Sequence, residues 1–325
     1  MPQIVHVAID GDSRSVTPRP GHGGDRFLRH LAELSPAGTR LHRGLVSTIQ
    51  AETTVLIGSK IDPGRLRTLP QLHTIIVPWA GIPRSLIDDV AASGRAVEIR
   101  NIHHNAPSAA ETAVGLLLAV ARGIPSLDAD LRRHDWRQRY LPRPSIRLEG
   151  AKAVVLGRGA IGRRIARALS GLGMVVEGLG RPTDGGRWCP AALARHVEAA
   201  MALMVAIPAG PETDAVIDAT VLDAMPGGIV VNVGRGSVID EAALYERLED
   251  RRLFGAGLDV WWRTPRREDE HGSTAPGTRP FHELGNLVMT PHVGGGLGEP
   301  DIEEARARAI AGIIEQLDQG ASGDG

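Results

Sequence analysis

Two patterns of apolar residues alternate along this chain of 325 residues. Short runs rich in Val and Ile suit strands that are buried on both faces of a parallel sheet. Segments between them show the three-to-four-residue periodicity of helices. The strand-like runs are residues 4–9, 55–58, 74–77, 97–99, 153–156, 175–176, 203–207, 229–233, 255–260 and 287–290. The alternation predicts an α/β protein.

The pattern also predicts a long apolar helix that begins at Ser108. Ser108 and Glu111 have the spacing of a capping box, and the apolar residues from Val114 to Ala121 share one helical face. Residues 263–281 are rich in Pro, Gly and charge and predict a surface loop. Further helices are expected at residues 26–34, 63–69, 86–92, 163–169, 241–249 and 301–317.

The strand-like run at residues 153–156 leads directly into a G-x-G-x-x-G motif and then a helix. This order is that of the first unit of a dinucleotide site. The first glycine permits a tight turn, the second lets a diphosphate approach the backbone, and the third lets helix and strand pack closely. The motif consists of Gly157, Arg158, Gly159, Ala160, Ile161 and Gly162.

Composition narrows the class of protein further. A formal net charge of -1 argues against a nucleic-acid surface, and the chain is long enough for two domains. The single cysteine, Cys189, excludes an internal disulfide and fits a reducing cytoplasm. No C-x-x-C or H-E-x-x-H pattern points to a metal site. No apolar run approaches the ~20 residues of a membrane span, so we expect a cytoplasmic protein.

Three polar residues follow successive strand-like runs behind the glycine motif: Arg235, Asp259 and His292. A guanidinium can bind a carboxylate through two hydrogen bonds and polarise an adjacent oxo group. An imidazolium can protonate a developing alkoxide, and the neutral ring can take the proton back. The set therefore indicates hydride chemistry on a 2-oxo acid. The alternatives are that Arg235 caps a helix or pairs on the surface, and that His292 is a solvated loop residue.

These motifs, in this order and spacing, resemble the D-isomer-specific 2-hydroxyacid dehydrogenases, a family that includes phosphoglycerate, glyoxylate/hydroxypyruvate and formate dehydrogenases. The similarity covers about residues 55–318 and is thin over residues 1–50. The motifs that carry it are residues 154–162, 231–236, 255–260 and 290–295, with Ala109-Ala110-Glu111 and Trp136 at positions where the family has similar residues.

The resemblance implies a Rossmann-type, doubly wound parallel sheet inserted into a smaller, flavodoxin-like α/β substrate domain. Residues 1–103 would be the substrate (lid) domain and residues 104–292 the dinucleotide-binding domain. Residues 293–325 would return to the substrate domain and pack a C-terminal helix on it. The helix from Ser108 to Arg122 would be the contact of a homodimer.

The resemblance also implies roles for single residues. Arg235 would bind the substrate carboxylate and oxo group, and His292 would be the acid/base. The backbone at Ala80 and Gly81 would receive the carboxylate, with His103 as a wall of the site; the alternative for His103 and His104 is a hinge without chemistry. Asp259 would accept from the nicotinamide amide. The remaining cofactor-lining residues would be Pro208, Thr213, Val233, Gly294 and Gly295, beside the glycine motif.

The chain departs from the family pattern at Thr264, which stands where the resemblance places a glutamate after the Asp259 strand. A carboxylate on the far ring nitrogen would raise the pKa of His292 and fix its tautomer. The Thr264 hydroxyl can orient the ring but supplies no charge, so we expect a less basic His292. Glu268, Asp269, Glu270 and Glu283 are alternative partners that would have to fold back.

A second departure concerns the ribose of the cofactor. NAD-specific folds carry an acidic residue about 20 residues beyond the glycines. Here Gly180 occupies that position and Arg181 follows, while Glu177 lies inside the strand. Without a carboxylate to repel a 2′-phosphate, and with an arginine to pair with it, we expect NADP(H) to be favoured over NAD(H).

The preferred interpretation is a cytoplasmic, homodimeric reductase of a 2-oxo acid that prefers NADP(H) and forms the D-2-hydroxy acid. Oxidation of another small anion, as formate or phosphite dehydrogenases perform on this fold, stays open because Thr264 is neutral. A nucleotide-dependent binding protein that has lost turnover is the third possibility. The presence of both Arg235 and His292 argues against that third one.

Overall fold

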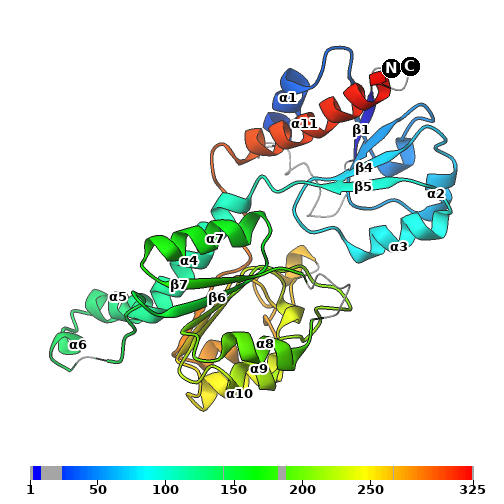
Figure 1. The fold of residues 1–325 in the computed structure, drawn as a ribbon. Coiled ribbons are helices and arrows are strands. Elements are labelled where there is room, and N and C mark those ends of the chain that lie inside the picture. Colours follow the sequence, from blue (N-terminus) through cyan, green and yellow to red (C-terminus); the bar gives the residue numbers. More distant parts are fainter. Residues whose placement is uncertain (1–2, 9–23, 142, 182–187, 266, 324–325) are drawn as a thin grey trace. The chain divides into compact units, whose positions relative to one another are not determined.

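The computed structural model describes residues 3–8, 24–141, 143–181, 188–265 and 267–323 of the chain. It consists of two compact units (Figure 1). Unit 1 comprises Met1–Asn105 and Leu297–Gly325, and unit 2 comprises Ala106–Gly296. The divisions fall after residues 105 and 296, compared with the 103 and 292 expected from the resemblance.

Unit 1 contains a five-stranded sheet in the order β2-β1-β3-β4-β5, and every strand pair in it is parallel. This is the flavodoxin-like order, which confirms the predicted class. The edge strand β2 was not predicted, because its sequence Arg-Leu-His-Arg-Gly is polar and no residue in it is fully buried. The strands are β1 (Ile4–Ala8), β2 (Arg40–Gly44), β3 (Val55–Ile57), β4 (Thr74–Val77) and β5 (Glu98–Asn101).

Helices cover both faces of the unit 1 sheet because alternate strand residues point to opposite sides. In β3, Val55 and Ile57 join the core that contains Phe27 of α1, whereas Leu56 joins the core that contains Leu86 of α3. Helices α1 and α11 pack side by side although they lie at opposite ends of the chain (Figure 1). The helices are α1 (Gly24–Leu34), α2 (Pro63–Arg67), α3 (Arg84–Ser93) and α11 (Ile302–Gly323).

Unit 2 contains a six-stranded sheet in the order β11-β10-β9-β8-β6-β7, again with parallel pairs only. The chain moves outward from β6 to β7 and then returns to β8 on the other side of β6. The topological switch point of a doubly wound sheet therefore lies between β6 and β8, where such sheets bind ligands. The strands are β6 (Lys152–Leu156), β7 (Val175–Leu179), β8 (Ala202–Val205), β9 (Ile229–Asn232), β10 (Gly255–Leu258) and β11 (Leu287–Met289).

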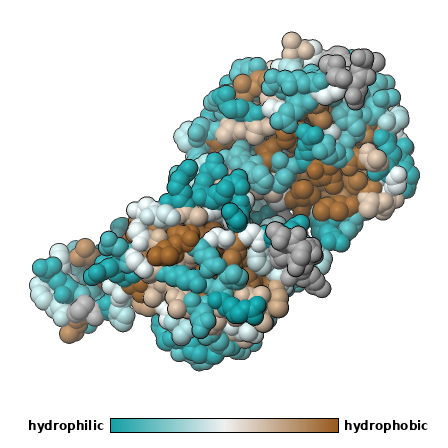
Figure 2. Space-filling view, in the orientation of Figure 1, coloured by the Kyte–Doolittle hydropathy of each residue, from teal (hydrophilic) through white to brown (hydrophobic). Residues whose placement is uncertain are grey.

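The long helix predicted at Ser108 is α4 (Ala106–Arg122), and it begins two residues earlier than expected. Ser108 is buried inside its first turns, so the proposed capping box was wrong. Helices α5 (Ile124–Arg132) and α6 (Arg137–Tyr140) follow and project from the rest of unit 2 as an arm (Figure 1). Figure 2 shows apolar and polar side chains side by side over this arm, at the left of the view. We call residues 124–141 the α5–α6 arm.

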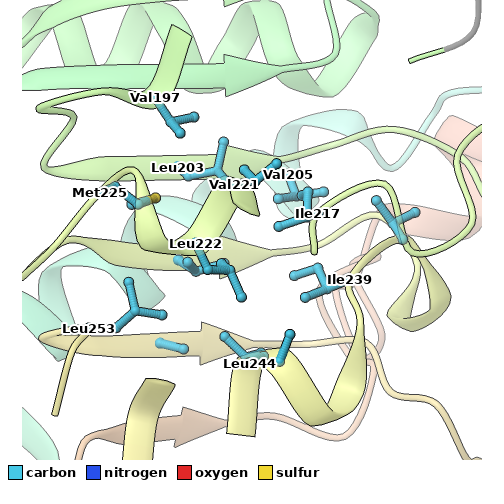
Figure 3. Packing of buried hydrophobic residues seen from close by; sticks show 14 of the residues in the cluster. Val197, Leu203, Val205, Ile217, Val221, Leu222, Met225, Ile239, Leu244 and Leu253 are labelled. Atoms are coloured by element: carbon cyan, nitrogen blue, oxygen red, sulfur yellow. The ribbon is translucent and has the colours of Figure 1, made fainter. Parts of the chain in front are cut away.

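Two hydrophobic cores sandwich the unit 2 sheet. Ala153 and Val155 of β6 face α4 and α7 (Ala160–Gly171), and Val154 and Leu156 face the opposite side. That opposite core is drawn in Figure 3, where side chains from the helices and the sheet point toward one another. The helices on this side are α8 (Pro190–Val197), α9 (Ala219–Asp223) and α10 (Glu241–Glu249).

Within the described ranges, no single helix is long and apolar enough to cross a membrane. Helices α4 and α5 would satisfy length and composition only as a pair, and they are bent by 65° relative to each other. Most of the apolar side chains of α4 are buried in unit 2.

Two histidines of unit 1, the buried His6 and the half-buried His104, have lowered pKa values. Burial lowers the pKa of His6, whose side chain is 2% exposed and whose Nδ1 has no hydrogen-bond partner. Burial, together with the nearby charges of Arg306 and His103, lowers the pKa of His104 to about 4. Both rings are therefore neutral in the folded protein at pH values where the unfolded chain already binds a proton.

We expect the free energy of unfolding to fall as the pH drops below 6.5, the ordinary histidine value, toward the lowered values. Each such histidine contributes a loss of up to ~1.4 kcal/mol per pH unit across that window. Urea unfolding of the full chain between pH 7.5 and pH 5 measures this slope. His6→Gln should make the slope shallower, and His282→Gln at an exposed site should not; equal slopes in both variants would contradict the assignment.

Candidate active site

The glycine motif forms the turn between β6 and α7 at the switch point of the sheet. Gly157 has φ +116°, a conformation that favours glycine, and a Cβ there would lie 2.5 Å from the carbonyl oxygen of Ala206 after β8. A Cβ on Gly162 would lie 1.7 Å from the carbonyl oxygen of Gly157. The turn, the neighbouring strand and the helix can therefore approach this closely only with glycine at both positions.

The N-terminus of α7 has the features of a diphosphate cradle. Its N-cap, Gly159, makes no side-chain capping hydrogen bond, and a Cβ on Gly159 would meet no atom within 4 Å. The first turn of α7, at Ala160 and Ile161, thus presents backbone N–H groups and the positive end of the helix dipole toward open space. These residues fit the diphosphate of a dinucleotide.

The ribose side of this cradle carries two arginines at the end of β7. The side chain of Arg158 lies along Gly180, whose Cβ would be 3.2 Å from Arg158 Cδ. Arg181 is 76% exposed, and its Nη2 lies 3.5 Å from Oε1 of Glu212. The sequence has no carboxylate at the position expected for binding the ribose. In the folded chain, however, Glu212 of the segment after β8 lies next to Arg181.

Glu177, in β7, points to other partners. Its Oε1 lies 2.6 Å from Nδ1 of His196, and its Oε2 lies 3.4 Å from Nζ of Lys152. These contacts agree with the expectation that Glu177 does not serve the ribose.

The loop after β8 is shaped by Thr213. Its side chain is 4% exposed and its hydroxyl donates to the carbonyl oxygens of Pro208 (2.8 Å) and Gly210 (3.2 Å). Thr213 therefore fixes the loop that carries Pro208, and its part in lining a cofactor stays a prediction.

Arg235, Asp259 and His292 follow β9, β10 and β11, which are neighbours in the sheet. Because these strands are parallel, their carboxyl ends meet at one edge, the same edge that carries the glycine turn. The three residues that the sequence singled out thus lie along the edge where α/β sheets bind ligands.

A buried asparagine shapes the Arg235 loop. Asn232 is 1% exposed; its Nδ2 donates to the carbonyl oxygen of Arg235 (2.9 Å), and its Oδ1 accepts from the N–H of Gly234 (2.9 Å). Arg235 is the N-cap of a short 3₁₀ helix but makes no capping hydrogen bond through its side chain. Sequence reasoning gave Asn232 no role, although an Asn at a strand end before Val-Gly is a known turn-forming signal.

The His292 loop is fixed by Asp259. His292 is exposed and has φ +57°, a left-handed conformation that is uncommon for a residue with a side chain. The carboxylate of Asp259 is buried and accepts hydrogen bonds from Thr290, Val293 and Gly294. A Cβ on Gly294 would lie 2.7 Å from Asp259 Oδ2, so Gly294 has a packing reason to be glycine. Neighbouring Gly295 is half-buried, and Val233, near Arg235, is buried.

The segment expected to be a surface loop, residues 263–281, ends in a fully buried side chain. Phe281 is 0% exposed and belongs to an aromatic cluster with Trp261, Trp262 and Tyr245. This cluster and the carboxylate of Glu241, which accepts from Thr278 and Arg279, anchor the segment to unit 2.

Thr264, near the start of this segment, is exposed. Three of the four carboxylates considered as alternatives to it have other neighbours. Asp269 and Glu270 pair with Arg267, and Glu283 lies 3.8 Å from His282.

The expected substrate residues of unit 1 lie at two places in that unit. Ala80 and Gly81 form the loop at the carboxyl end of β4, where the carbonyl oxygen of Ala80 accepts from Asn101. His103 is exposed, and His104 lies beside Arg306, with 3.4 Å between His104 Nε2 and Arg306 Nε. Among the described side chains, no group of three or more His, Cys, Asp or Glu residues could bind a metal ion.

Comparison with known proteins decides which family this arrangement belongs to. The model of the D-isomer specific 2-hydroxyacid dehydrogenase, NAD binding domain, matches residues 114–294, more than half of the chain. The chain is also 31% identical over 295 residues to the glycerate dehydrogenase of Methylorubrum extorquens, with 88% of each chain covered. The chain belongs to the D-isomer specific 2-hydroxyacid dehydrogenase family.

Two further relatives show how far the similarity to this family extends. The D-3-phosphoglycerate dehydrogenase of Mycobacterium tuberculosis is 32% identical over 284 residues, which cover 82% of this chain. The chain spans about half the length (51%) of that relative. The NADPH-dependent glyoxylate/hydroxypyruvate reductase of Sinorhizobium meliloti, solved with citrate, superposes with a TM-score of 0.67 at 25% identity, covering 96% of this chain and 92% of the other.

Membership of the family agrees with the fold of both units and with the dinucleotide-binding domain predicted from the glycine motif. Sequence reasoning found the glycine turn and the strand-end residues Arg235, Asp259 and His292. It missed Asn232, whose contacts with Gly234 and Arg235 are local, and Glu212, whose contact with Arg181 joins loops that lie next to each other only in the folded sheet.

Proposed function

We propose that this protein is an oxidoreductase that transfers a hydride between a nicotinamide dinucleotide and a small 2-oxo acid or D-2-hydroxy acid. The observation that supports this most directly is that Arg235 and His292 follow β9 and β11, the two strands on either side of β10, at the edge that also carries the glycine turn. The family of the chain, whose members include the glycerate dehydrogenase described above, supports the same reaction class.

Each residue of the site has a defined task in this proposal. Arg235 binds the substrate carboxylate and stabilises the negative charge that develops on the oxo oxygen. His292, as an imidazolium, donates a proton to that oxygen during reduction and removes it during oxidation. The assignment of Ala80, Gly81 and His103 as substrate contacts stays a prediction. The nicotinamide, when bound, supplies or accepts the hydride.

Thr264 occupies the position next to His292 in this proposal and orients its ring without adding charge. The imidazolium is then less stabilised than beside a carboxylate. Reduction, which requires the protonated ring, should therefore decline at a lower pH than in relatives with a glutamate. A pH–rate profile of the unmodified protein measures this point in the assay described next.

We expect the protein to oxidise NADPH in the presence of at least one of glyoxylate, hydroxypyruvate, phenylpyruvate or phosphonopyruvate. His292→Ala should lower kcat by about 10²- to 10⁴-fold, the usual contribution of a general acid. His282→Ala, at an exposed site in the same unit, is the matched control and should retain full activity.

Turnover of formate or phosphite, with none of these 2-oxo acids, would favour the other-anion alternative. Tight NADPH binding without any turnover would favour a binding protein. Unchanged kcat in His292→Ala would refute the assignment of the acid.

We further propose that NADP(H) is favoured over NAD(H). Arg158 and Arg181 lie at the end of β7, where a ribose 2′-phosphate is expected. The contact of Arg181 with Glu212 is exposed, and exposed ion pairs contribute only about 0–1 kcal/mol, so a dianionic phosphate can displace it. The NADPH-dependent reductase of Sinorhizobium meliloti is consistent with this preference.

Arg181→Ala should lower kcat/KM for NADPH by about 10- to 100-fold and leave that for NADH nearly unchanged, because a charge-assisted contact contributes about 1.5–3 kcal/mol. Glu212→Gln should act in the opposite direction by releasing Arg181. Arg167→Ala removes the same charge from an exposed site on α7 and serves as the control. A clear NADH preference of the unmodified protein would overturn this proposal.

We also propose that the protein forms a homodimer, with the α5–α6 arm that follows α4 as the main contact. The expected contact was the Ser108–Arg122 helix, but most apolar side chains of that helix are buried within unit 2. The arm instead exposes several large hydrophobic side chains. Apolar side chains grouped in this way on a protein surface are typical of an interface with a partner. They are Ile124, Leu127, Leu131, Trp136, Tyr140 and Leu141.

Light scattering on the purified protein should give twice the monomer mass. Leu131→Arg should yield monomers, because it places a charge among the apolar side chains of the arm. Leu45→Arg makes the same change at an exposed leucine of unit 1 and should remain dimeric. A monomeric unmodified protein would contradict the proposal.

A further inference from the structure

The carboxylate of Asp259 is the centre of a buried hydrogen-bond network around His292. Asp259 is 2% exposed. Its Oδ1 accepts from the hydroxyl of Thr290 (2.7 Å) and from the N–H of Val293 (3.0 Å), and its Oδ2 accepts from the N–H of Gly294 (3.0 Å). A carboxylate has about four acceptor positions, so the His292 loop occupies most of them.

These three donors lie on both sides of His292 in the sequence. His292 itself has φ +57°. Such a backbone conformation is unfavourable for a residue with a side chain and persists only where the surroundings impose it. The bonds to residues 290, 293 and 294 impose it here, and they thereby set the direction in which the imidazole leaves the backbone.

Trp261 adds a fourth bond to the same loop from the strand end that carries Asp259. Its indole N–H donates to the carbonyl oxygen of Thr290 at 2.9 Å. Its backbone packs against Gly236, where a Cβ would lie 2.3 Å from the carbonyl carbon of Trp261. Trp261 therefore joins the loop of His292 to the segment that directly follows Arg235.

We propose that Trp261, acting through Thr290 and together with Asp259, is a positioning residue for His292. The inference rests on the proposed function, because it assumes that His292 is the acid/base. Whatever contacts the imidazole itself makes, the backbone of the His292 loop sets the position and direction from which the ring starts. Asp259 and Trp261 hold that backbone in place.

Trp262 provides an internal comparison. It is half-buried like Trp261, its indole N–H donates to the carbonyl oxygen of Ile239 (2.8 Å), and its ring stacks on Phe281 with centroids 5.1 Å apart. Replacing either tryptophan by phenylalanine removes one indole hydrogen bond and keeps an aromatic ring. Only Trp261 donates to the His292 loop, so the pair separates positioning from general packing.

The first experiment compares Trp261→Phe with Trp262→Phe. We expect similar losses in thermal stability, because each variant loses one N–H···O bond of the same kind. Single-turnover reduction of the best 2-oxo acid of the screen by NADPH should slow about tenfold in Trp261→Phe only, with KM for the acid changed less than threefold. Equal slowing in both variants, or no slowing in either, would overturn the proposal.

A second measurement does not depend on turnover. Amide hydrogen exchange at Val293 and Gly294 reports the bonds to Asp259, and it should accelerate at least tenfold in Trp261→Phe and remain unchanged in Trp262→Phe. If the unmodified protein reduces no 2-oxo acid, the proposed function fails while this measurement still tests the positioning. Unchanged exchange in Trp261→Phe would refute it.

Thr290 tests the same network should Trp261→Phe fail to fold. Thr290→Val keeps the shape of the side chain and removes the hydroxyl that donates to Asp259, whereas Thr290→Ser keeps the hydroxyl. Thr290→Val should reproduce the slow reduction and the fast exchange, and Thr290→Ser should restore both. Identical behaviour of the two variants would show that the hydroxyl does not position His292.

Discussion

Parallel pairing of the six strands in unit 2 is the constraint on which its candidate site depends. Because every strand runs in the same direction, all the loops that follow the strands emerge at one edge of the sheet. The glycine turn, the arginines beyond β7 and the loops of Arg235 and His292 are gathered there from residues spread over more than a hundred positions of sequence. Glycine at positions 157 and 162 is what allows β6, α7 and the loop after β8 to meet so closely.

Polar side chains at the strand ends give this edge its shape. Asn232 closes the turn that carries Arg235, and Asp259 closes the loop that carries His292. Both side chains are buried. A buried polar atom that lost its hydrogen bond would lower the stability of the fold by about 1–3 kcal/mol. This penalty favours the one loop geometry in which all these atoms are hydrogen-bonded. The chemistry proposed for the half-buried Arg235 and the exposed His292 thus depends on neighbours that are buried.

The departures from sequence expectation have specific physical causes. β2 lies at the edge of its sheet, pairs with β1 alone and has no fully buried residue. Its sequence is therefore polar, and the apolar periodicity that reveals other strands is missing from it. α4 begins before Ser108 because its first turn is buried, and burial overrides a capping-box pattern. The charged segment of residues 263–281 lies largely at the surface as expected, and the unforeseen part is its last residue, Phe281, which stacks on Trp262 and is buried in the core.

The sequence alone determined the α/β class, the dinucleotide turn and the strand-end residues Arg235, Asp259 and His292. Each of these is encoded locally, by the spacing of apolar residues, by glycines next to a strand and by polar residues directly after strands. Only the tertiary structure decided which loops touch. The contacts of Glu212 with Arg181 and of Trp261 with Thr290 join residues about 30 positions apart, and their distance in space depends on the order of strands in the sheet.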